Sequence, residues 1–163
     1  MQQQNTDNDS FDTFLENLKS RMKNVFHLRA DINQMATKRG MPPFVMREIM
    51  DLKPLSVGIP AEYGGRGCKM EENLALLATA SYESLALSLT FGINSALFLQ
   101  PVAKFAREET KQKVFYDFIN HQNMGGLMIT EPDFGSDALN MQTFYTEKGN
   151  KYHIKGTKHW AGL

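Results

Sequence analysis

The spacing of the apolar residues changes near residue 124, and this change limits the folds open to the 163-residue chain. Before it, apolar residues recur at three- and four-residue steps, which is the period of one helix face. After it, they alternate or run together as they do in β-strands. We therefore expect a mainly α protein, with an α-helical, bundle-like domain over residues 1–122. The start of an antiparallel β-domain is expected over residues 123–163.

Local signals place the individual elements of this architecture. The first apolar stripe predicts a helix from Phe11 to Arg29, capped by Asp9 or Ser10. Pro43 is expected to open a short second helix, which Pro54 ends. Further helices are expected at about 71–87, 90–106 and 109–121. Strands are expected at 125–130, 141–147 and 151–154, with a hairpin turn at 148–150.

The helix expected at 71–87 is apolar on nearly all sides, which predicts burial on several sides. The uncharged run from Ser84 to Ala103 is long enough to raise the possibility of a membrane span. Its serines, asparagine, glutamine and Pro101 favour a helix pair buried inside a protein instead. We therefore expect no membrane span.

Charge and cysteine content exclude several function classes. Eighteen basic residues balance eighteen acidic ones, which argues against a nucleic-acid partner. One cysteine, Cys68, excludes an internal disulfide framework and indicates a reducing compartment. The first ten residues have no apolar core and no arginine, so neither a secretory signal nor a transit peptide is expected. Together these features predict a cytoplasmic protein.

The chain ends directly after Lys158-His159-Trp160, with no strand closing the predicted sheet. A two-stranded hairpin is marginally stable alone. We therefore expect the chain to be truncated.

The segment from Thr130 to Asp137 carries the most informative chemistry. A hydroxyl residue at the end of a strand precedes a loop shaped by Pro132 and Gly135. Its backbone N–H groups and the Ser136 hydroxyl can converge on a phosphate or carbonyl oxygen. Trp160 offers a flat apolar face for a ring system. An ordinary turn with a capping serine and a core tryptophan remains the alternative, and is the commoner arrangement for such loops.

Three motifs occur in order along the chain. They are Ile59-Pro60-Ala61-Glu62-Tyr63-Gly64-Gly65, then Ile129-Thr130-Glu131-Pro132 with Gly135-Ser136-Asp137, and then a hairpin from Asn150 leading to Lys158-His159-Trp160. From Phe11 to its end, the chain resembles the N-terminal portion of the acyl-CoA dehydrogenase family. The resemblance implies a helical domain, a middle β-domain and a C-terminal four-helix domain, with FAD bound between them.

The resemblance also implies cofactor contacts. Residues matching Leu127, Ile129 and Thr130 contact the flavin ring and its pyrimidine edge. Those matching Gly135 and Ser136 lie along the ribityl–pyrophosphate stretch, and Ser136 also lies beside the acyl-CoA chain. The residue matching Trp160 flanks the isoalloxazine. Two positions depart from the family pattern: Leu127 stands where an aromatic is common, and Gly162 where a threonine or serine lies near flavin N5.

The reaction implied is α,β-dehydrogenation of an acyl-CoA thioester. A carboxylate takes the α proton, hydrogen bonds stabilise the developing enolate, and the β hydride goes to the flavin. The family's base is a glutamate of the C-terminal domain, so we nominate no catalytic residue here. The implied partners are the acyl-CoA thioester and electron-transfer flavoprotein as acceptor, in a homo-oligomer when full length.

Other interpretations of the same residues remain open. A non-catalytic helical interaction module of the same fold is one, and an acyl-CoA oxidase or related flavin monooxygenase is another. His153 and His159 lack further ligands at metal-binding spacing, so no metal site is expected. Glu131 has the chemistry of a base, but the resemblance gives it a role in shaping the loop.

Overall fold

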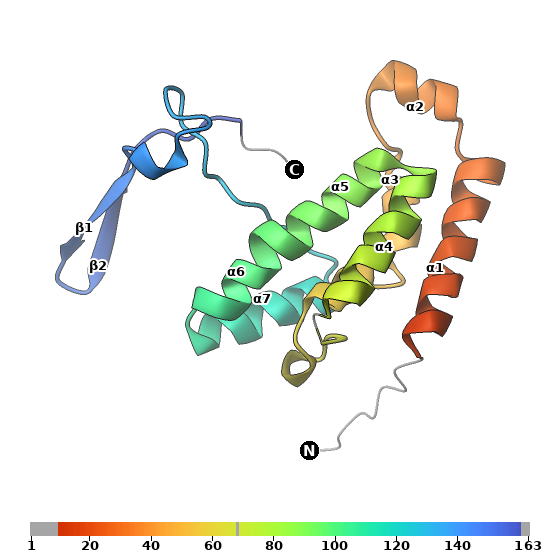
Figure 1. Cartoon of the computed structure of the whole chain (residues 1–163), viewed down its shortest axis with the longest axis horizontal. Helices are drawn as coiled ribbons and strands as arrows, with labels where there is room; N and C mark the ends of the chain where they lie inside the picture. Colours follow the sequence, from red (N-terminus) through yellow and green to blue (C-terminus); the bar gives the residue numbers. More distant parts are fainter. Residues whose placement is uncertain (1–9, 68, 161–163) are drawn as a thin grey trace. The chain divides into compact units, whose positions relative to one another are not determined.

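The computed structural model describes residues 10–67 and 69–160 (Figure 1). Its internal contacts divide the chain into two units, Met1–Met124 and Gly125–Leu163. The first unit is helical where it is described, and the second contains a two-stranded antiparallel sheet. The predicted fold class, mainly α with a β segment following the helices, is confirmed.

The helical unit consists of seven α-helices joined by short π- and 3₁₀-helical turns over its described residues. In chain order these are α1 (Phe11–Asn24), η1 (Val25–Arg29), α2 (Ile32–Lys38), α3 (Pro43–Met50), η2 (Pro54–Gly58), η3 (Ala61–Tyr63), α4 (Met70–Glu83), α5 (Leu85–Gly92), η4 (Ile93–Leu99), α6 (Gln100–Phe105) and α7 (Glu108–Asn120).

Capping and apolar periodicity explain most of these helices. The Ser10 side chain accepts a hydrogen bond from the Thr13 amide at 3.2 Å, so Ser10 is the predicted N-cap of α1. Apolar side chains one helical turn apart then enter a single core. Its fully buried large members are Leu18, Met22, Val25, Val45, Ile49, Leu55, Ile59, Leu76, Leu87, Phe91, Leu99 and Phe115.

The sequence analysis missed α2 and misplaced the signal that ends α3. None of the residues of α2 is buried, so it carries no apolar stripe. The Asp31 side chain caps it by accepting from the Gln34 amide at 2.9 Å, and Arg39 ends it in the left-handed conformation.

Helix α3 begins at Pro43 as predicted but ends at Met50. Pro54 opens η2 instead of ending a helix.

The helix expected at 71–87 is divided at Ser84. Ser84 has an extended backbone and its hydroxyl accepts from the Leu87 amide at 3.3 Å, which starts α5. Within α4 only Asn73, Leu76 and Ala80 are buried. The expected burial on several sides is therefore wrong. An apolar face is buried only where another element packs on it, and α1 and α5 pack against α4 along part of its circumference.

The helical segment Leu85–Phe105 is long and apolar enough to cross a membrane, judged by length and composition alone. In the structure 28% of an apolar 18-residue window within that stretch is buried. Leu87, Phe91 and Leu99 point into the core, and the buried Asn94 side chain donates to the carbonyl oxygen of Thr90 at 2.8 Å. Because one such helix is weak evidence, the absence of a membrane span stays a prediction.

The second unit contains a hairpin of β1 (Phe144–Lys148) and β2 (Lys151–Lys155). Its register runs from Phe144 opposite Lys155 to Lys148 opposite Lys151, and Gly149 takes a φ of 60° in the turn. The predicted hairpin is confirmed. The strand expected at 125–130 is not present: this segment has no regular secondary structure. Apolar residues form a strand only where a neighbouring strand supplies a hydrogen-bonded ladder, and the described hairpin pairs with itself.

Candidate cofactor-binding site

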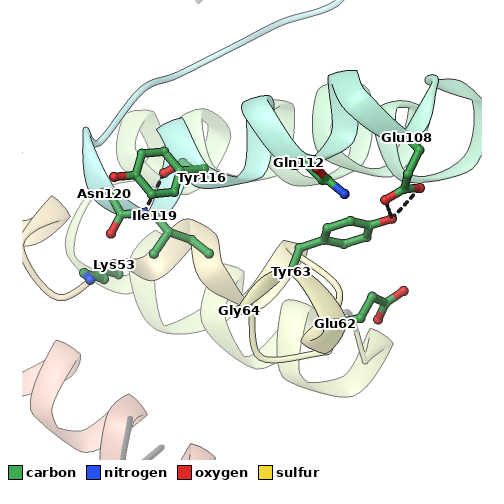
Figure 2. A pocket seen from close by; sticks show the side chains of 9 residues that line it. All are labelled: Lys53, Glu62, Tyr63, Gly64, Glu108, Gln112, Tyr116, Ile119 and Asn120. Atoms are coloured by element: carbon green, nitrogen blue, oxygen red, sulfur yellow. Dashed lines mark hydrogen bonds between the residues drawn. The ribbon is translucent and has the colours of Figure 1, made fainter. Parts of the chain in front are cut away.

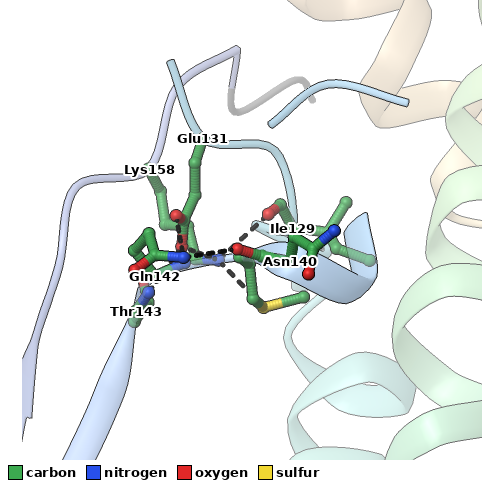
Figure 3. Close-up of polar contacts among 7 residues, drawn as sticks. Ile129, Glu131, Asn140, Gln142, Thr143 and Lys158 are labelled. Carbon is green, nitrogen blue, oxygen red and sulfur yellow. Dashed lines mark hydrogen bonds and ion pairs between the residues drawn. The ribbon is translucent and has the colours of Figure 1, made fainter. Parts of the chain in front are cut away.

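Two segments far apart in sequence lie side by side in the second unit. The His159 amide donates to the carbonyl oxygen of Thr130 at 2.9 Å. The Lys158 ammonium donates to the carbonyl oxygen of Ile129 at 3.0 Å. These bonds place residues 129–131 against residues 158–160, as Figure 3 shows for Ile129, Glu131 and Lys158.

Glu131 lies at the centre of this contact and is only 4% exposed. One carboxylate oxygen accepts from the Gln142 amide at 2.6 Å. The other accepts from the Thr143 amide at 2.8 Å and from the Lys158 ammonium at 3.0 Å (Figure 3). The carboxylate therefore joins three segments of the chain.

These bonds set the ionisation of Glu131. Hydrogen bonding from Thr143 makes the largest contribution, with further help from the Gln142 amide and Lys158, and lowers the pKa of Glu131 to about 2 against the opposing effect of desolvation. A carboxylate with so low a pKa is a weak proton acceptor near neutral pH. Glu131 therefore shapes the loop, as expected, and does not have the properties of a base.

The predicted cofactor contacts are exposed. Leu127 and Ile129 are 44% and 42% exposed, and Trp160 is 83% exposed. Thr130 is half-buried, and Ser136 is exposed. Trp160 is thus not a core residue among the described residues of this unit. Its neighbour His159 meets its ring edge-on, with 4.9 Å between ring centroids.

These residues fit a large planar cofactor in their chemistry. Exposed apolar and aromatic faces suit a ring system, and the exposed Ser136 hydroxyl suits a polar or charged group. A Cβ placed on Gly135 would meet no atom within 4 Å, so the loop is open there. The structure brings Ile129 and Thr130 together with Lys158 and His159, which directly precede Trp160. No hydrogen bond among the described residues joins Gly135 and Ser136 to that group, and Gly162 lies outside the described residues.

Sequence reasoning missed Lys158 as a functional residue. It recognised this lysine only as part of a motif ending in Trp160. The available signal was Glu131 itself, a single charged residue following the apolar run from Gly125 to Thr130. A carboxylate buried in such a setting needs a cation or several N–H donors, and Lys158 is the cation that the structure supplies.

An open groove of about 740 Å³ lies in the helical unit (Figure 2). Across it the Tyr63 hydroxyl donates to both Glu108 carboxylate oxygens, at 2.8 and 2.9 Å. This hydrogen bond to Glu108 is the main cause of a raised Tyr63 pKa. The Tyr63 ring also packs on Phe115, with 4.8 Å between centroids. These contacts fasten the glycine-rich loop to α7 and assemble no catalytic group.

Among residues 10–67 and 69–160, no group of three or more histidine, cysteine or acidic side chains is arranged to hold a metal ion. In the second unit the charged side chains that meet at the candidate site are Glu131 and Lys158, which form an ion pair. The candidate site therefore combines exposed apolar side chains with an ion pair between the buried Glu131 carboxylate and the partly exposed Lys158 ammonium.

Comparison with known proteins identifies the family. Residues 14–122 match the acyl-CoA dehydrogenase N-terminal domain. Mitochondrial isovaleryl-CoA dehydrogenase of Bos taurus is 30% identical over 114 residues, covering 70% of this chain and 27% of its own length. The chain therefore belongs to the acyl-CoA dehydrogenase family, and it spans about a quarter of the length of that relative.

Solved structures show the same fold. Butyryl-CoA dehydrogenase from Megasphaera elsdenii aligns with a TM-score of 0.75 at 20% identity, over 91% of this chain and 39% of that one. An acyl-CoA dehydrogenase from Bacillus anthracis, solved in complex with FAD, aligns with a TM-score of 0.71 at 22% identity. That alignment covers 94% of this chain and 27% of the other. The resemblance to the N-terminal part of this family is thus confirmed.

Proposed function

We propose that this chain supplies the N-terminal helical part and a flavin-contacting segment of an FAD-dependent acyl-CoA dehydrogenase. The observation that carries the proposal is the side-by-side placement of residues 129–130 and 158–160, which leaves the Ile129 and Trp160 side chains exposed. Exposed apolar side chains in such a cluster commonly mark a binding surface. Membership of the family supports FAD as the molecule bound.

The proposal assigns each residue a role. Leu127, Ile129 and Trp160 would hold the flavin ring, while Thr130 would bond to its pyrimidine edge. Gly135 and Ser136 would hold the ribityl–pyrophosphate stretch, and Gly162 would offer a backbone N–H near the ring. The chemistry that FAD supplies when bound is acceptance of a hydride.

The substrate proposed is an acyl-CoA thioester, with Ser136 beside its chain. The low pKa of Glu131 and its three hydrogen-bond donors argue against Glu131 as the base. We propose that the base lies outside the 163 residues, in a C-terminal helical domain. Electron-transfer flavoprotein is the proposed acceptor, and the assembled enzyme is proposed to be a homo-oligomer.

Equilibrium dialysis against FAD tests the proposal, with thermal unfolding measured on the same samples. Ser136→Ala is expected to weaken FAD binding by about 10- to 100-fold, because a hydrogen bond to a charged group contributes about 1.5–3 kcal/mol. Trp160→Phe is expected to weaken it by about 2- to 10-fold through altered ring contact. Neither variant should lower the melting temperature, since both side chains are exposed.

Tyr145→Phe is the matched control, because Tyr145 is an exposed aromatic residue of the same unit that is not assigned to the site. It should bind FAD as the unmodified chain does. If Ser136→Ala and Trp160→Phe also bind FAD normally, or if Trp160→Phe melts several degrees lower, the cofactor assignment is wrong.

A further inference from the structure

We propose that Lys158 and Glu131 are positioning residues of this site: they fix the Ile129–Thr130 segment against the segment that carries Trp160, and so form one flavin-binding surface. The inference rests on the proposed function, because it takes FAD as the molecule bound. It assigns no chemical step to either residue. It concerns how the contact surface is held in place.

The bonds of Lys158 show how one side chain fixes three parts of the loop. Its ammonium donates to the Ile129 carbonyl and to the Glu131 carboxylate, both at 3.0 Å, and to the Met141 sulfur at 3.5 Å. An ammonium has three N–H donors, so each donor has a partner. Lys158 thereby ties the 129–131 segment and residue 141 to the irregular segment that follows β2 and precedes Trp160.

Apolar packing does not provide an alternative support. Leu127, Ile129 and Trp160 are exposed, and every residue of β1 and β2 is exposed as well. In the described part of this unit the one fully buried side chain is Glu131. The relative position of the two segments therefore depends on the polar network and on the bond from the His159 amide to Thr130.

The network is sensitive to the loss of either charge. Removing the Lys158 ammonium leaves the Glu131 carboxylate buried with its amide donors but without a counter-charge, which favours opening of the loop toward water. Opening would release the carbonyl oxygens of Ile129 and Thr130 from residues 158 and 159. The Trp160 ring would then lose its fixed position relative to Ile129 while the hairpin, which lies beyond Thr143, stays paired.

Two measurements on the 163-residue chain test this inference. The first is hydrogen exchange of the His159 amide, followed by NMR without any ligand. The second is titration with FAD, followed by quenching of the fluorescence of Trp160, the single tryptophan of the chain. Lys158→Met and Glu131→Gln are the test variants. Lys155→Met is the matched control, because Lys155 is an exposed lysine at the end of β2.

Lys158→Met and Glu131→Gln are each expected to speed His159 exchange and to weaken FAD binding at least about tenfold, as the loss of a charged hydrogen bond predicts. The exchange of the β1 and β2 amides should not change, which separates loss of position from loss of folding. Lys158→Arg retains the charge and the donors, so it should restore FAD binding to within about threefold of the unmodified chain. Lys155→Met should match the unmodified chain in both measurements.

Two results would overturn the inference. Unchanged His159 exchange in both test variants would show that the charge pair does not hold the segments together. Faster exchange with normal FAD binding would show that it holds them without serving the site. Failure of the unmodified 163-residue chain to bind FAD is a separate result: it counts against the proposed function of this chain, while His159 exchange still tests whether the charge pair holds the segments together.

Discussion

Replacement of Gly65 by alanine should destabilise the helical unit more than a substitution in an exposed loop usually does. A Cβ on Gly65 would overlap the carbonyl oxygen of Ile59, whose side chain is fully buried. Two hydrogen bonds flank this contact: the Arg66 amide donates to Ser56 at 2.8 Å, and the Gly67 amide donates to Ile59 at 3.0 Å. The loop closes tightly around this position, and only glycine lets the two backbone segments approach so closely.

The expected loss of folding free energy can be worked out from the contacts that a Cβ on Gly65 would disrupt. Separating the segments costs about 1–3 kcal/mol for overpacking. Breaking or stretching the two flanking hydrogen bonds adds about 0.5–1.5 kcal/mol each. The total of about 2–6 kcal/mol is a large part of the stability of a typical domain. It should lower the melting temperature by roughly 10 °C or more.

Thermal unfolding followed by helical circular dichroism measures this effect. Gly40→Ala is the matched control, because a Cβ there would lie 3.8 Å from the Lys38 carbonyl oxygen, an ordinary contact. The control should change the free energy of unfolding by less than about 1 kcal/mol. If Gly65→Ala melts within about 2 °C of Gly40→Ala, the loop tolerates a side chain at this position and the steric argument fails.

Two further predictions concern acid stability and exposed apolar surface. Because the pKa of Glu131 is about 2 in the folded chain and 4.5 is its ordinary value, its stabilising effect should be present above pH 4.5 and lost as the pH falls toward 2. The Thr143 amide donates to Glu131, so its protection against exchange, taken relative to the intrinsic rate at each pH, should fall over that range in the unmodified chain and in Glu147→Gln. In Glu131→Gln this protection should not change with pH. The exposed apolar side chains Leu74 and Tyr82 on α4, with Leu85 and Leu89 on α5, should make the 163-residue chain bind the dye ANS or self-associate. Leu85→Gln combined with Leu89→Gln should reduce both effects, and a monomer by sedimentation that binds no dye would contradict the prediction.

Elements with strong periodicity could be predicted from the sequence. Helix α1 shows this best, because Phe14, Leu18 and Met22 recur at helical spacing and Ser10 caps it. The hairpin was equally visible, since Gly149 marks its turn between alternating residues. Helix α2 could not be found in this way. Of its residues only Met35 packs against the core, and that side chain is only partly buried, so the stability of α2 depends more on the capping Asp31 and on propensity than on an apolar pattern.

The candidate site could be predicted only in part. The motif residues that carry the family resemblance indicated where a cofactor would contact the chain, and the exposure of Ile129 and Trp160 agrees with a contact role. The bond between the His159 amide and the Thr130 carbonyl could not be predicted, because a hydrogen bond between backbone groups does not depend on which side chains the two residues carry. The pairing of Glu131 with Lys158 joins residues 27 positions apart, and charge alone does not identify such partners.

The second unit reverses the usual division between interior and surface. Its buried side chain is a carboxylate, while its tryptophan and several aliphatic residues face outward. A unit with little apolar interior gains little stability from the hydrophobic effect. Its conformation therefore depends more on the hydrogen bonds to Glu131. An apolar core in the same place would require Ile129 and Trp160 to turn inward, where they would no longer be available to a ligand. Burying the Glu131 carboxylate instead leaves these side chains outside, while its bonds to Lys158 and to the Gln142 and Thr143 amides hold the backbone. This arrangement accounts for a buried glutamate at the centre of the proposed site by its hydrogen bonds to the surrounding backbone and to Lys158.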